Sequence, residues 1–213
     1  MLELVGCVAN GKTSDAAVAA SPEAIRAYLG YLRRHDEKVD PSAKFETRIA
    51  EHNIEGLFSG QAIVPPDLRP LAPGDLARYL RWLEWSREDL LALVKGIDDR
   101  RLRSKPAKGR SLHEILLHVL GADKGYVYAL VGPLKTMGDP TNAAERGELD
   151  LRLALAEARR AAIARLATLT VAERKRVRRA GQSTYSAFRV IRRMLEHEWE
   201  HRREIAARMG REA

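Results

Sequence analysis

The stretch that decides the fold is STYSAFRVIRRMLEHEWEHRREIAARM, residues 183–209, which is predicted to form the last helix. Its apolar residues recur at helical spacing, so one stripe is expected to face a core. His197 and His201 fall on that stripe four residues apart, so both imidazoles leave one face of the helix. Burying two imidazoles without partners is costly, and binding one metal ion removes that cost. The apolar positions of the stripe are Phe188, Ile191, Met194, Ile205 and Met209.

A third metal ligand is predicted on an earlier helix. His118 lies between Ile115 and Ala122, on the side that the apolar spacing turns inward. Three neutral imidazoles suit zinc, and also nickel or iron, because all these ions accept nitrogen donors. Three protein ligands leave a coordination position open for a water or a substrate thiolate, which is the catalytic pattern. The sequence therefore predicts a divalent transition metal bound by His118, His197 and His201.

Composition limits the class of protein. Of the 213 residues, 45% are hydrophobic, 31% are charged and 6% are aromatic, which fits a helix-rich soluble protein with a real core. The formal net charge is +8. Part of this excess lies in two clusters, Arg100–Arg110 and Arg174–Arg179, which are predicted to be loops or helix ends. A solvated basic surface is therefore favoured over a nucleic-acid interface.

Cysteine usage and hydropathy favour the cytoplasm. Cys7 is the one cysteine, so an internal disulfide is excluded and a reducing compartment is expected. No apolar run approaches membrane-spanning length, and the N-terminus lacks the basic and apolar regions of a secretory signal. We therefore expect a cytoplasmic protein without membrane contact, and no catalytic role for Cys7.

Residues 1–58 are predicted to form a small α+β module. Leu2–Val8 is a short run typical of a strand, and Thr13 is placed to cap an Ala-rich helix. Ser21–Pro22 is predicted to restart that helix, because proline is favoured at a first helical position. The apolar face of the second piece is expected from Ile25, Leu29 and Leu32. Ala43–Glu51 alternates between apolar and polar residues and predicts another strand.

Residues 59–74 are predicted to be a stiff, extended linker, because four prolines fall close together.

From Asp75, expected as an N-cap, the pattern turns helical and stays so. Ser111 and Glu114 predict a capping box at the start of the second helix. Helices are expected from 75 to about 96, from 112 to about 131, from 142 to 168 and from 183 to about 209, with a basic loop after the first and a loop through Gly138–Thr141 before the third. A short capped turn is expected at Thr170. Four helices joined by loops predict a four-helix bundle over residues 75–213.

The N-terminal unit resembles the HicB family of small antitoxin-like α+β domains. The resemblance rests on Glu3–Val8, on Asn10–Thr13, on the helix through Glu23–Ile25 and on the strand after it. It implies toxin binding or regulation, although an accessory or dimerisation module is favoured. The family's strand hairpin before Gly6 is missing, so the short sheet has an open edge. A second copy of the chain, the C-terminal domain or sequence upstream of Met1 would cover that edge.

Residues 75–213 resemble the DinB-like superfamily, which includes mycothiol-dependent maleylpyruvate isomerases and bacillithiol transferases. The matching features are Arg87–Leu91 in the first helix, Ser111–Val119 in the second and His197–His201 in the last. The resemblance maps the family's metal ligands onto His118, His197 and His201. It also implies thiol chemistry, with a low-molecular-weight thiol as a cofactor.

Other polar residues are predicted around the ligands. Glu114, one turn before His118, and Glu204, near His201, are candidates to accept a ring N–H and so orient an imidazole. Both are alternatively solvent-facing partners of Lys or Arg. Tyr126 is expected to pack, with lining of the cavity as the alternative. The remaining histidines, His35, His52 and His113, are expected at the surface.

Two functions are compatible with these patterns. The first is a metal-dependent enzyme, a thiol-dependent transferase or a hydrolase acting on a small molecule. The second is a non-catalytic regulatory protein whose metal holds the bundle and whose N-terminal module recruits a partner, for instance a toxin-like protein. The open sheet edge and the bundle favour a homodimer in either case. The sequence contains no Ser–His–Asp arrangement, phosphate-binding loop or dinucleotide fingerprint.

Overall fold

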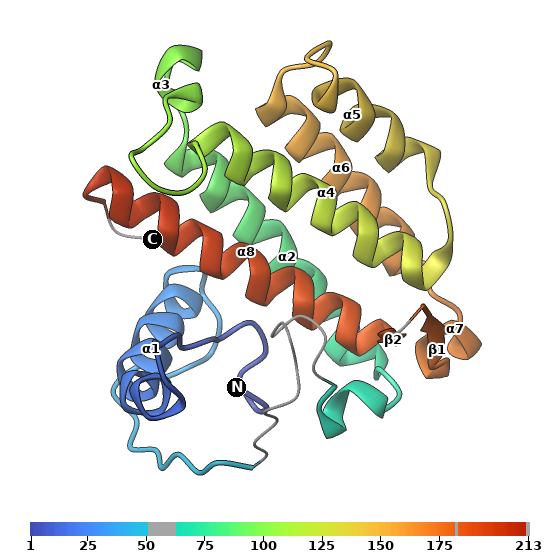
Figure 1. Ribbon diagram of the computed structural model, residues 1–213. Helices are drawn as coiled ribbons and strands as arrows, with labels where there is room; N and C mark the ends of the chain where they lie inside the picture. Colours follow the sequence, from blue (N-terminus) through green and yellow to red (C-terminus); the bar gives the residue numbers. More distant parts are fainter. Residues whose placement is uncertain (51–62, 182, 212–213) are drawn as a thin grey trace.

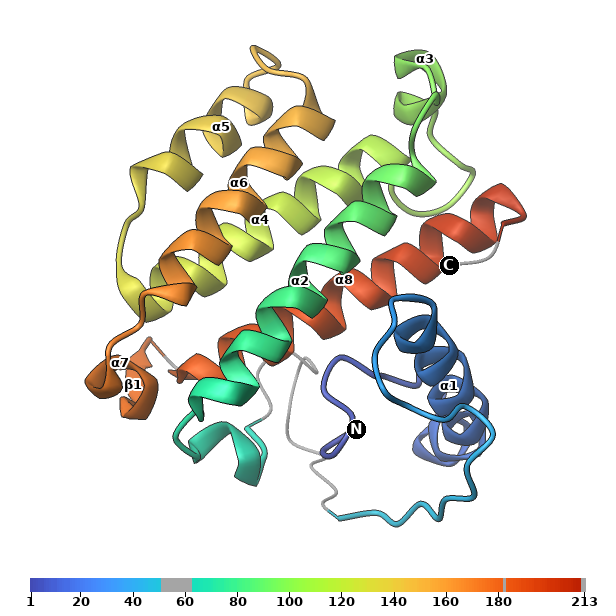
Figure 2. The same cartoon turned by 180° about the vertical axis from the view of Figure 1, so that it is seen from behind.

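Four long helices form a bundle in the computed structural model, which describes residues 1–50, 63–181 and 183–211 (Figure 1). Two of them, α2 and α4, each pack against both of the others, α6 and α8. Seen from behind, α6 lies over α4 and next to the shorter α5 (Figure 2). This agrees with the predicted bundle. The four helices are α2 (Pro73–Leu93), α4 (Leu112–Val131), α6 (Leu151–Ala167) and α8 (Ala187–Met209).

Shorter elements complete the described chain. An N-terminal helix, α1, lies beside α8 (Figure 1). The strands of the described residues form one antiparallel hairpin in which Arg178 faces Tyr185. Gly181, at φ +61°, makes the turn between them. The bounds are α1 (Ser14–Arg34), the 3₁₀ helix η1 (Pro65–Leu68), α3 (Asp99–Arg103), α5 (Lys135–Glu145), α7 (Val171–Lys175), β1 (Arg178–Ala180) and β2 (Ser183–Tyr185).

Local capping chemistry sets most helix starts. The predicted box at α4 is confirmed, since the Ser111 hydroxyl accepts from the Glu114 amide while Glu114 accepts from the Ser111 amide. The capped turn at Thr170 is also confirmed. The starts of the first and last helices of the bundle were predicted wrongly. α2 begins at Pro73, two residues before the expected cap Asp75, because proline is favoured in a first helical turn. α8 begins after Ser186, since residues 183–185 are used by β2.

The predicted loop through residues 138–141 was wrong, because these residues belong to α5. Packing overrides the local helix breakers: Gly138 and Pro140 are buried, and the Tyr128 hydroxyl lies where a Cβ of residue 138 would sit. The third predicted helix, 142–168, is consequently two helices. Gly147, at φ +74°, follows the end of α5, and the Asp150 carboxylate caps α6 by accepting from two amides.

Neither strand predicted in the N-terminal unit is present in residues 1–50, so the α+β module was wrong for the described residues. Leu2–Val8 folds into a turn, with the Cys7 amide donating to the Leu4 carbonyl at 3.0 Å. Gly6 adopts φ +94°, and the Tyr28 hydroxyl occupies the space of a side chain there. Ala43–Ala50 is extended but mostly exposed, with no strand beside it to pair with among the described residues. Glu51 lies outside them.

The N-terminal helix is continuous, so the predicted restart at Ser21–Pro22 was wrong. Its predicted cap, Thr13, is confirmed and accepts from the Ala16 amide at 3.1 Å. A proline inside a helix costs about 3 kcal/mol, and burial of the aromatic rings of Tyr28 and Tyr31 against Trp199 of α8 offsets this. The buried face of α1 is formed by Ser21, Ala24, Tyr28, Tyr31 and Leu32, whereas Ile25 and Leu29 are half-buried.

The described part of the predicted linker, residues 63–74, is docked rather than extended free of the bundle. Pro65–Leu68 forms η1, and Asp67 is 1% exposed. Its two carboxylate oxygens accept from Nε and Nη2 of Arg192 on α8, at 2.8 and 2.6 Å. A paired buried charge of this kind needs a fixed backbone. The division of the chain into units at residues 59–74 stays a prediction.

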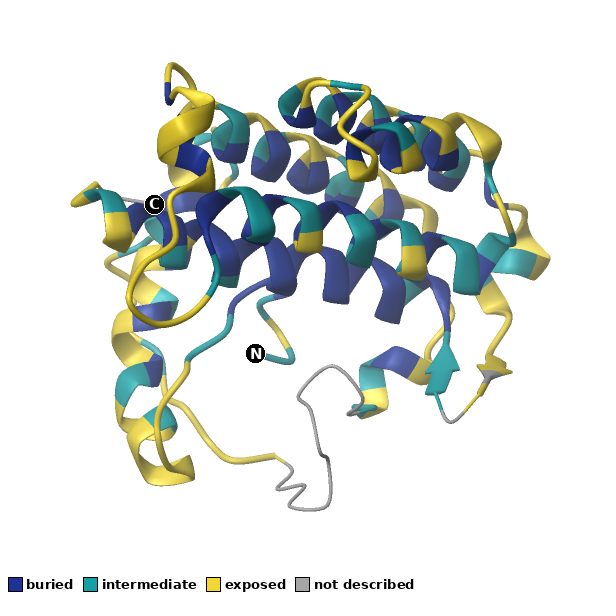
Figure 3. Cartoon of the chain, turned by 45° about the horizontal axis from the view of Figure 1, so that its top comes forward, coloured by how far each residue is buried: buried dark blue, intermediate teal, exposed yellow. Residues whose placement is uncertain are grey.

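Helix α8 lies at the centre of the molecule. Residues 189–199 are all buried (Figure 3), which a helix with one apolar stripe does not require. The reason is that α2 and α4 cover one side, while η1 and the N-terminal segment cover the other. No helix in the described ranges is long and apolar enough to cross a membrane.

Candidate metal centre

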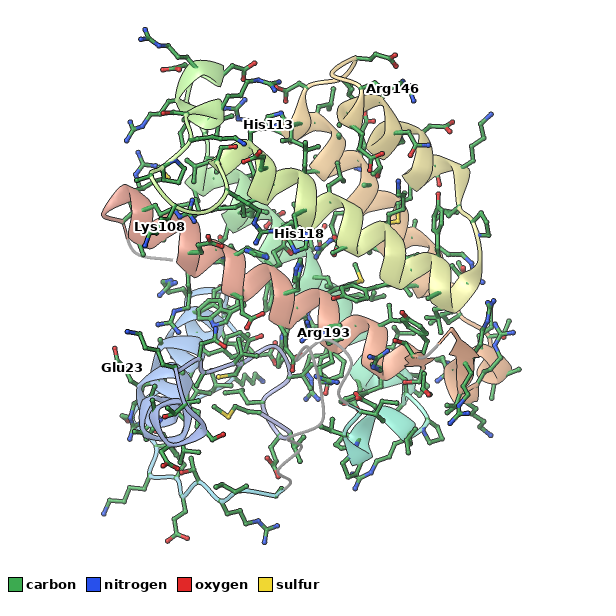
Figure 4. The ribbon with its side chains drawn as sticks, in the orientation of Figure 1. Glu23, Lys108, His113, His118, Arg146 and Arg193 are labelled. Carbon is green, nitrogen blue, oxygen red and sulfur yellow. The ribbon has the colours of Figure 1, made fainter. Side chains whose placement is uncertain are left out.

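The three predicted ligands come together between α4 and α8. Nε2 of His197 lies 2.9 Å from Nε2 of His118 and 3.2 Å from Nε2 of His201. One ligand atom from each residue lies within 4.8 Å of the other two. Figure 4 shows His118 reaching from α4 to the α8 side of the bundle. His197 and His201 are buried, but His118 is exposed, so the expectation that it faces inward was wrong.

The spacing of the histidine nitrogens is compatible with one metal ion. Two ligands of a tetrahedral zinc site, each about 2.0–2.1 Å from the ion, lie roughly 3.3 Å apart. The two short separations among the histidine nitrogens, 2.9 and 3.2 Å, are close to that value. The site is therefore compact enough for one transition metal ion.

The possible positions of the ring protons also favour a cation between the three histidines. Nδ1 of His201 lies 2.9 Å from a Glu204 oxygen, so it carries a proton and leaves Nε2 of the neutral ring as a bare acceptor. If Nε2 of His197 carries a proton, it can donate to Nε2 of His201. It then has no lone pair left to accept a hydrogen bond from Nε2 of His118. A proton on Nδ1 of His197 instead has no acceptor among the described atoms. Every neutral arrangement leaves one contact unsatisfied, whereas a metal ion accepts all three lone pairs.

Desolvation favours the neutral form of two of the three imidazoles, those of His197 and His118. The pKa of His197 is lowered to about 3, first by burial and then by the neighbouring His201 and His118. Partial desolvation of its ring, followed by the charge of Arg110, also lowers the pKa of His118. A metal ligand must be deprotonated, so both rings are available as ligands at neutral pH.

Glu204 orients His201, as one of the two carboxylate predictions proposed. Its other oxygen accepts from Arg208 of α8, and the same guanidinium donates to the Arg110 carbonyl before α4. This chain of contacts fixes the ring and ties it to the loop beside His118. Glu114, the other candidate, accepts from Ser111 and pairs with Lys105 at 2.9 Å.

A ring of four buried charges lies beside the ligands. Each long helix contributes one residue: Arg87 from α2, Asp123 from α4, Arg159 from α6 and Glu198 from α8, all at most 3% exposed. Arg87 donates to Glu198 at 2.6 Å and to Asp123 at 2.8 Å, and Arg159 donates to both carboxylates at 2.7 Å. The ring sets the register of α4 against α8, and so of His118 against His197.

This ring of charges was not predicted from the sequence. The sequence pattern that could have indicated it is a charged residue at an inward helical position. Arg87 follows Leu83 by one turn, and Arg159 follows Leu155 by one turn. Such a position is costly unless the charge is paired, and the pairing partners are on other helices.

Tyr126 and Arg193 extend the site along α4 and α8. The Tyr126 ring meets the His197 ring edge-on, with centroids 6.2 Å apart. Arg193 lies one turn before His197 and is 5% exposed. Burial lowers the pKa of Arg193, but the adjacent Tyr126 and Glu196 raise it by more, so the guanidinium stays charged. Tyr126 therefore flanks the triad.

The other histidines lie apart from the triad. His35 was expected at the surface but is half-buried, stacked on Trp85 with ring centroids 5.0 Å apart and 3.1 Å from Asp89. His113 is also half-buried, and burial lowers its pKa. His52 lies outside the described residues.

The comparison with known families agrees with this geometry. Residues 82–205, more than half of the chain, match the DinB superfamily. The chain belongs to the DinB superfamily. None of the curated proteins and none of the solved structures matches it. The superfamily match spans all three histidines but leaves residues 1–58 outside it, so the HicB-like resemblance is not supported.

Proposed function

We propose that this DinB superfamily protein is a metal-dependent enzyme, a hydrolase or a thiol-dependent transferase. The observation that carries the proposal is the convergence of three Nε2 atoms from His118, His197 and His201. These atoms would hold a divalent transition metal, zinc or alternatively nickel or iron, which when bound would lower the pKa of a water or thiol at its open position to near neutral. A low-molecular-weight thiol would be the co-substrate of a transferase.

The chain's own residues prepare this site. Glu204 holds the His201 ring in the tautomer whose Nε2 is free. The four buried charges keep α4 and α8 in register, so the ligands need no rearrangement. His118 is exposed, so the triad lies at the edge of the bundle, and its three protein ligands would leave a coordination position for water or a substrate, whereas a structural centre has four protein ligands.

Metal analysis tests the centre. Purified protein should contain about one transition metal ion per chain by inductively coupled plasma mass spectrometry, and His118→Ala should lose most of it. Because His118 is exposed, this variant should still fold, which circular dichroism checks. His113→Ala, on the same helix, is the matched control and should keep the metal. Equal metal in His118→Ala and the parent would remove His118 from the site.

A second assay separates the two reaction classes. A hydrolase should cleave 4-nitrophenyl esters without added thiol, and a transferase should conjugate a thiol to 1-chloro-2,4-dinitrobenzene. Either activity should fall on chelation and return with the metal. A metal-replete protein that is inactive in both assays and equally stable with and without metal would argue against this proposal.

A further inference from the structure

One end of the molecule carries an excess of positive charge. Figure 1 shows α7 and the β1–β2 hairpin together where α8 begins. The segment around η1 is tied to this end, because the Leu71 amide donates to the Arg174 carbonyl at 3.1 Å and the Arg174 guanidinium donates back to the Leu71 carbonyl at 3.1 Å. We call this region, residues 63–71 and 168–181, the α7 end.

The uncompensated charges of the α7 end are positive. Glu173 and Asp67 are the acidic residues of its two segments. Both are already paired, Glu173 with Arg165 and the buried Asp67 with Arg192. The cations of the two segments are more numerous, and most of them lie at the surface. The exposed ones are Arg69, Lys175, Arg176, Arg178 and Arg179.

Large apolar side chains are uncovered at the same end. Leu68 is 52% exposed, Val171 57% and Val177 46%. A single exposed apolar residue needs no explanation, but here three lie close in the chain to exposed cations. The surface of an anionic bilayer accommodates both kinds of side chain. Its headgroups attract Lys and Arg, and its interface takes up short apolar groups.

The other basic cluster of the chain, Arg100–Arg110, differs in both respects. Asp98 and Asp99 are exposed beside it, and Lys105 pairs with Glu114 at 2.9 Å. The large apolar residue of this cluster, Leu102, is buried. Cations without uncovered apolar neighbours are expected of an ordinary solvated surface.

Nucleic acid is the other polyanion that exposed cations can bind. Phosphate contacts need cations alone, so they leave the uncovered leucine and valines unexplained. Single strands also stack on exposed aromatic rings. The aromatic residue of the hairpin, Tyr185, is half-buried, with the Arg189 guanidinium 5.0 Å from its ring centroid. The observations therefore favour a lipid surface.

We propose that the α7 end binds peripherally to the surface of an anionic membrane. The exposed cations meet the lipid phosphates, while Leu68, Val171 and Val177 enter the headgroup region. The prediction of no membrane contact was drawn from the lack of a spanning run, and peripheral binding requires none. This role goes beyond the metal centre and does not depend on it.

Co-sedimentation of the full chain with vesicles tests the proposal. Vesicles of phosphatidylcholine containing phosphatidylglycerol should bind the protein. Vesicles of phosphatidylcholine alone should bind it at least about tenfold more weakly, since each cation near an anionic surface strengthens binding about fivefold. Raising the ionic strength from about 0.1 M to about 0.5 M should weaken the binding, because salt screens the charges. Equal binding to both kinds of vesicle, or binding to neither, would overturn the proposal.

Paired arginine variants locate the contact. Arg178→Gln with Arg179→Gln should weaken binding to the anionic vesicles at least about tenfold. Arg100→Gln with Arg101→Gln makes the same charge change at exposed positions of α3 and should bind as the parent does. Circular dichroism checks that both proteins fold. An equal loss in the two variants would mean that net charge alone decides binding, against the proposal.

A valine variant and a DNA duplex separate the lipid surface from nucleic acid. Val171→Asn with Val177→Asn keeps the charge but removes apolar surface, so it should weaken vesicle binding at least about threefold. A fluorescently labelled duplex, compared at equal phosphate concentration by anisotropy, should bind the parent more weakly than the anionic vesicles do. Unchanged vesicle binding in the valine variant, or tighter binding of the duplex than of the vesicles, would overturn the proposal.

Discussion

Glu204 lies 2.9 Å from Nδ1 of His201, on the ring side opposite the nitrogen that contacts His197. A carboxylate in this position fixes which nitrogen of the imidazole carries the proton and therefore which one is a ligand. The contact links the triad to Arg208 and, through it, to the loop before α4.

The first prediction concerns this contact. Glu204→Ala should weaken metal binding about 10–100-fold, the usual effect of losing a partner that orients a ligand. Competition with a chromogenic chelator measures the change. Glu200→Ala, one turn earlier on the same helix, is the control and should bind metal as the parent does. Equal affinity in the two variants would show that Glu204 does not orient His201.

The second prediction concerns the buried charges. Arg159→Met leaves Asp123 and Glu198 to share Arg87, and breaking a buried pair in this way costs about 3–5 kcal/mol of unfolding free energy. Urea unfolding followed by circular dichroism measures it. Arg160→Met, at the adjacent exposed position, should change stability by no more than about 0.5 kcal/mol. Similar costs for both variants would contradict the assigned role of the ring.

The third prediction concerns pH and the cap of α4. Hydrogen bonds from the Ser111 backbone, followed by Lys105, lower the pKa of Glu114 from 4.5 to about 2. A depressed carboxyl pKa stabilises the folded state fully above the unfolded value and loses this effect as the pH falls through the folded value. The gap in urea midpoint between the parent and Glu114→Gln should therefore be widest above about pH 4.5 and should close toward pH 2.

A matched variant separates titration from general loss of the cap. Ser111→Ala removes the hydroxyl that accepts from the Glu114 amide, at a cost of about 1 kcal/mol. That hydroxyl does not titrate in this range, so its cost should persist at low pH. A Glu114→Gln gap that stays constant from pH 7 to pH 2.5 would contradict the lowered pKa.

The fourth prediction concerns the N-terminal segment. The Tyr28 hydroxyl donates to the Val5 carbonyl at 2.8 Å in a buried place. Tyr28→Phe leaves that carbonyl without its donor and should cost about 1 kcal/mol. Hydrogen exchange at the Cys7 amide, which closes the same turn, should become faster, while exchange in the middle of α4 should not change. Equal acceleration in both regions would mean that the segment does not open separately.

Signals that are local in the sequence were predicted well. The Ser111–Glu114 capping box involves residues three apart in the chain, so it could be predicted from the sequence. The four-residue spacing of His197 and His201 likewise predicts that they share one face of the helix. His118 was placed correctly near them, since a helical stripe and a family resemblance both pointed to it. The exposure of His118 was not predicted, because its apolar neighbours Ile115 and Val119 face the core while its own ring lies at the edge of the bundle.

Features that depend on tertiary partners were predicted poorly. Leu2–Val8 has the composition of a strand, but Tyr28 occupies the space beside Gly6 and the run turns. Gly138 and Pro140 are breakers that packing against Tyr128 and α6 overrides. Asp67 sits among prolines typical of a linker, and its ion pair is with Arg192, 125 residues later.

The junction between the N-terminal region and the bundle has a practical consequence. All three tryptophans of the chain lie there: Trp82 donates to Glu37, Trp85 stacks on His35, and Trp199 contacts Tyr28 and Tyr31. The intrinsic tryptophan fluorescence of this protein therefore reports on the packing of the N-terminal region against the bundle. Detachment of the first fifty residues would shift the emission to longer wavelength while the helical far-ultraviolet signal of the bundle persisted.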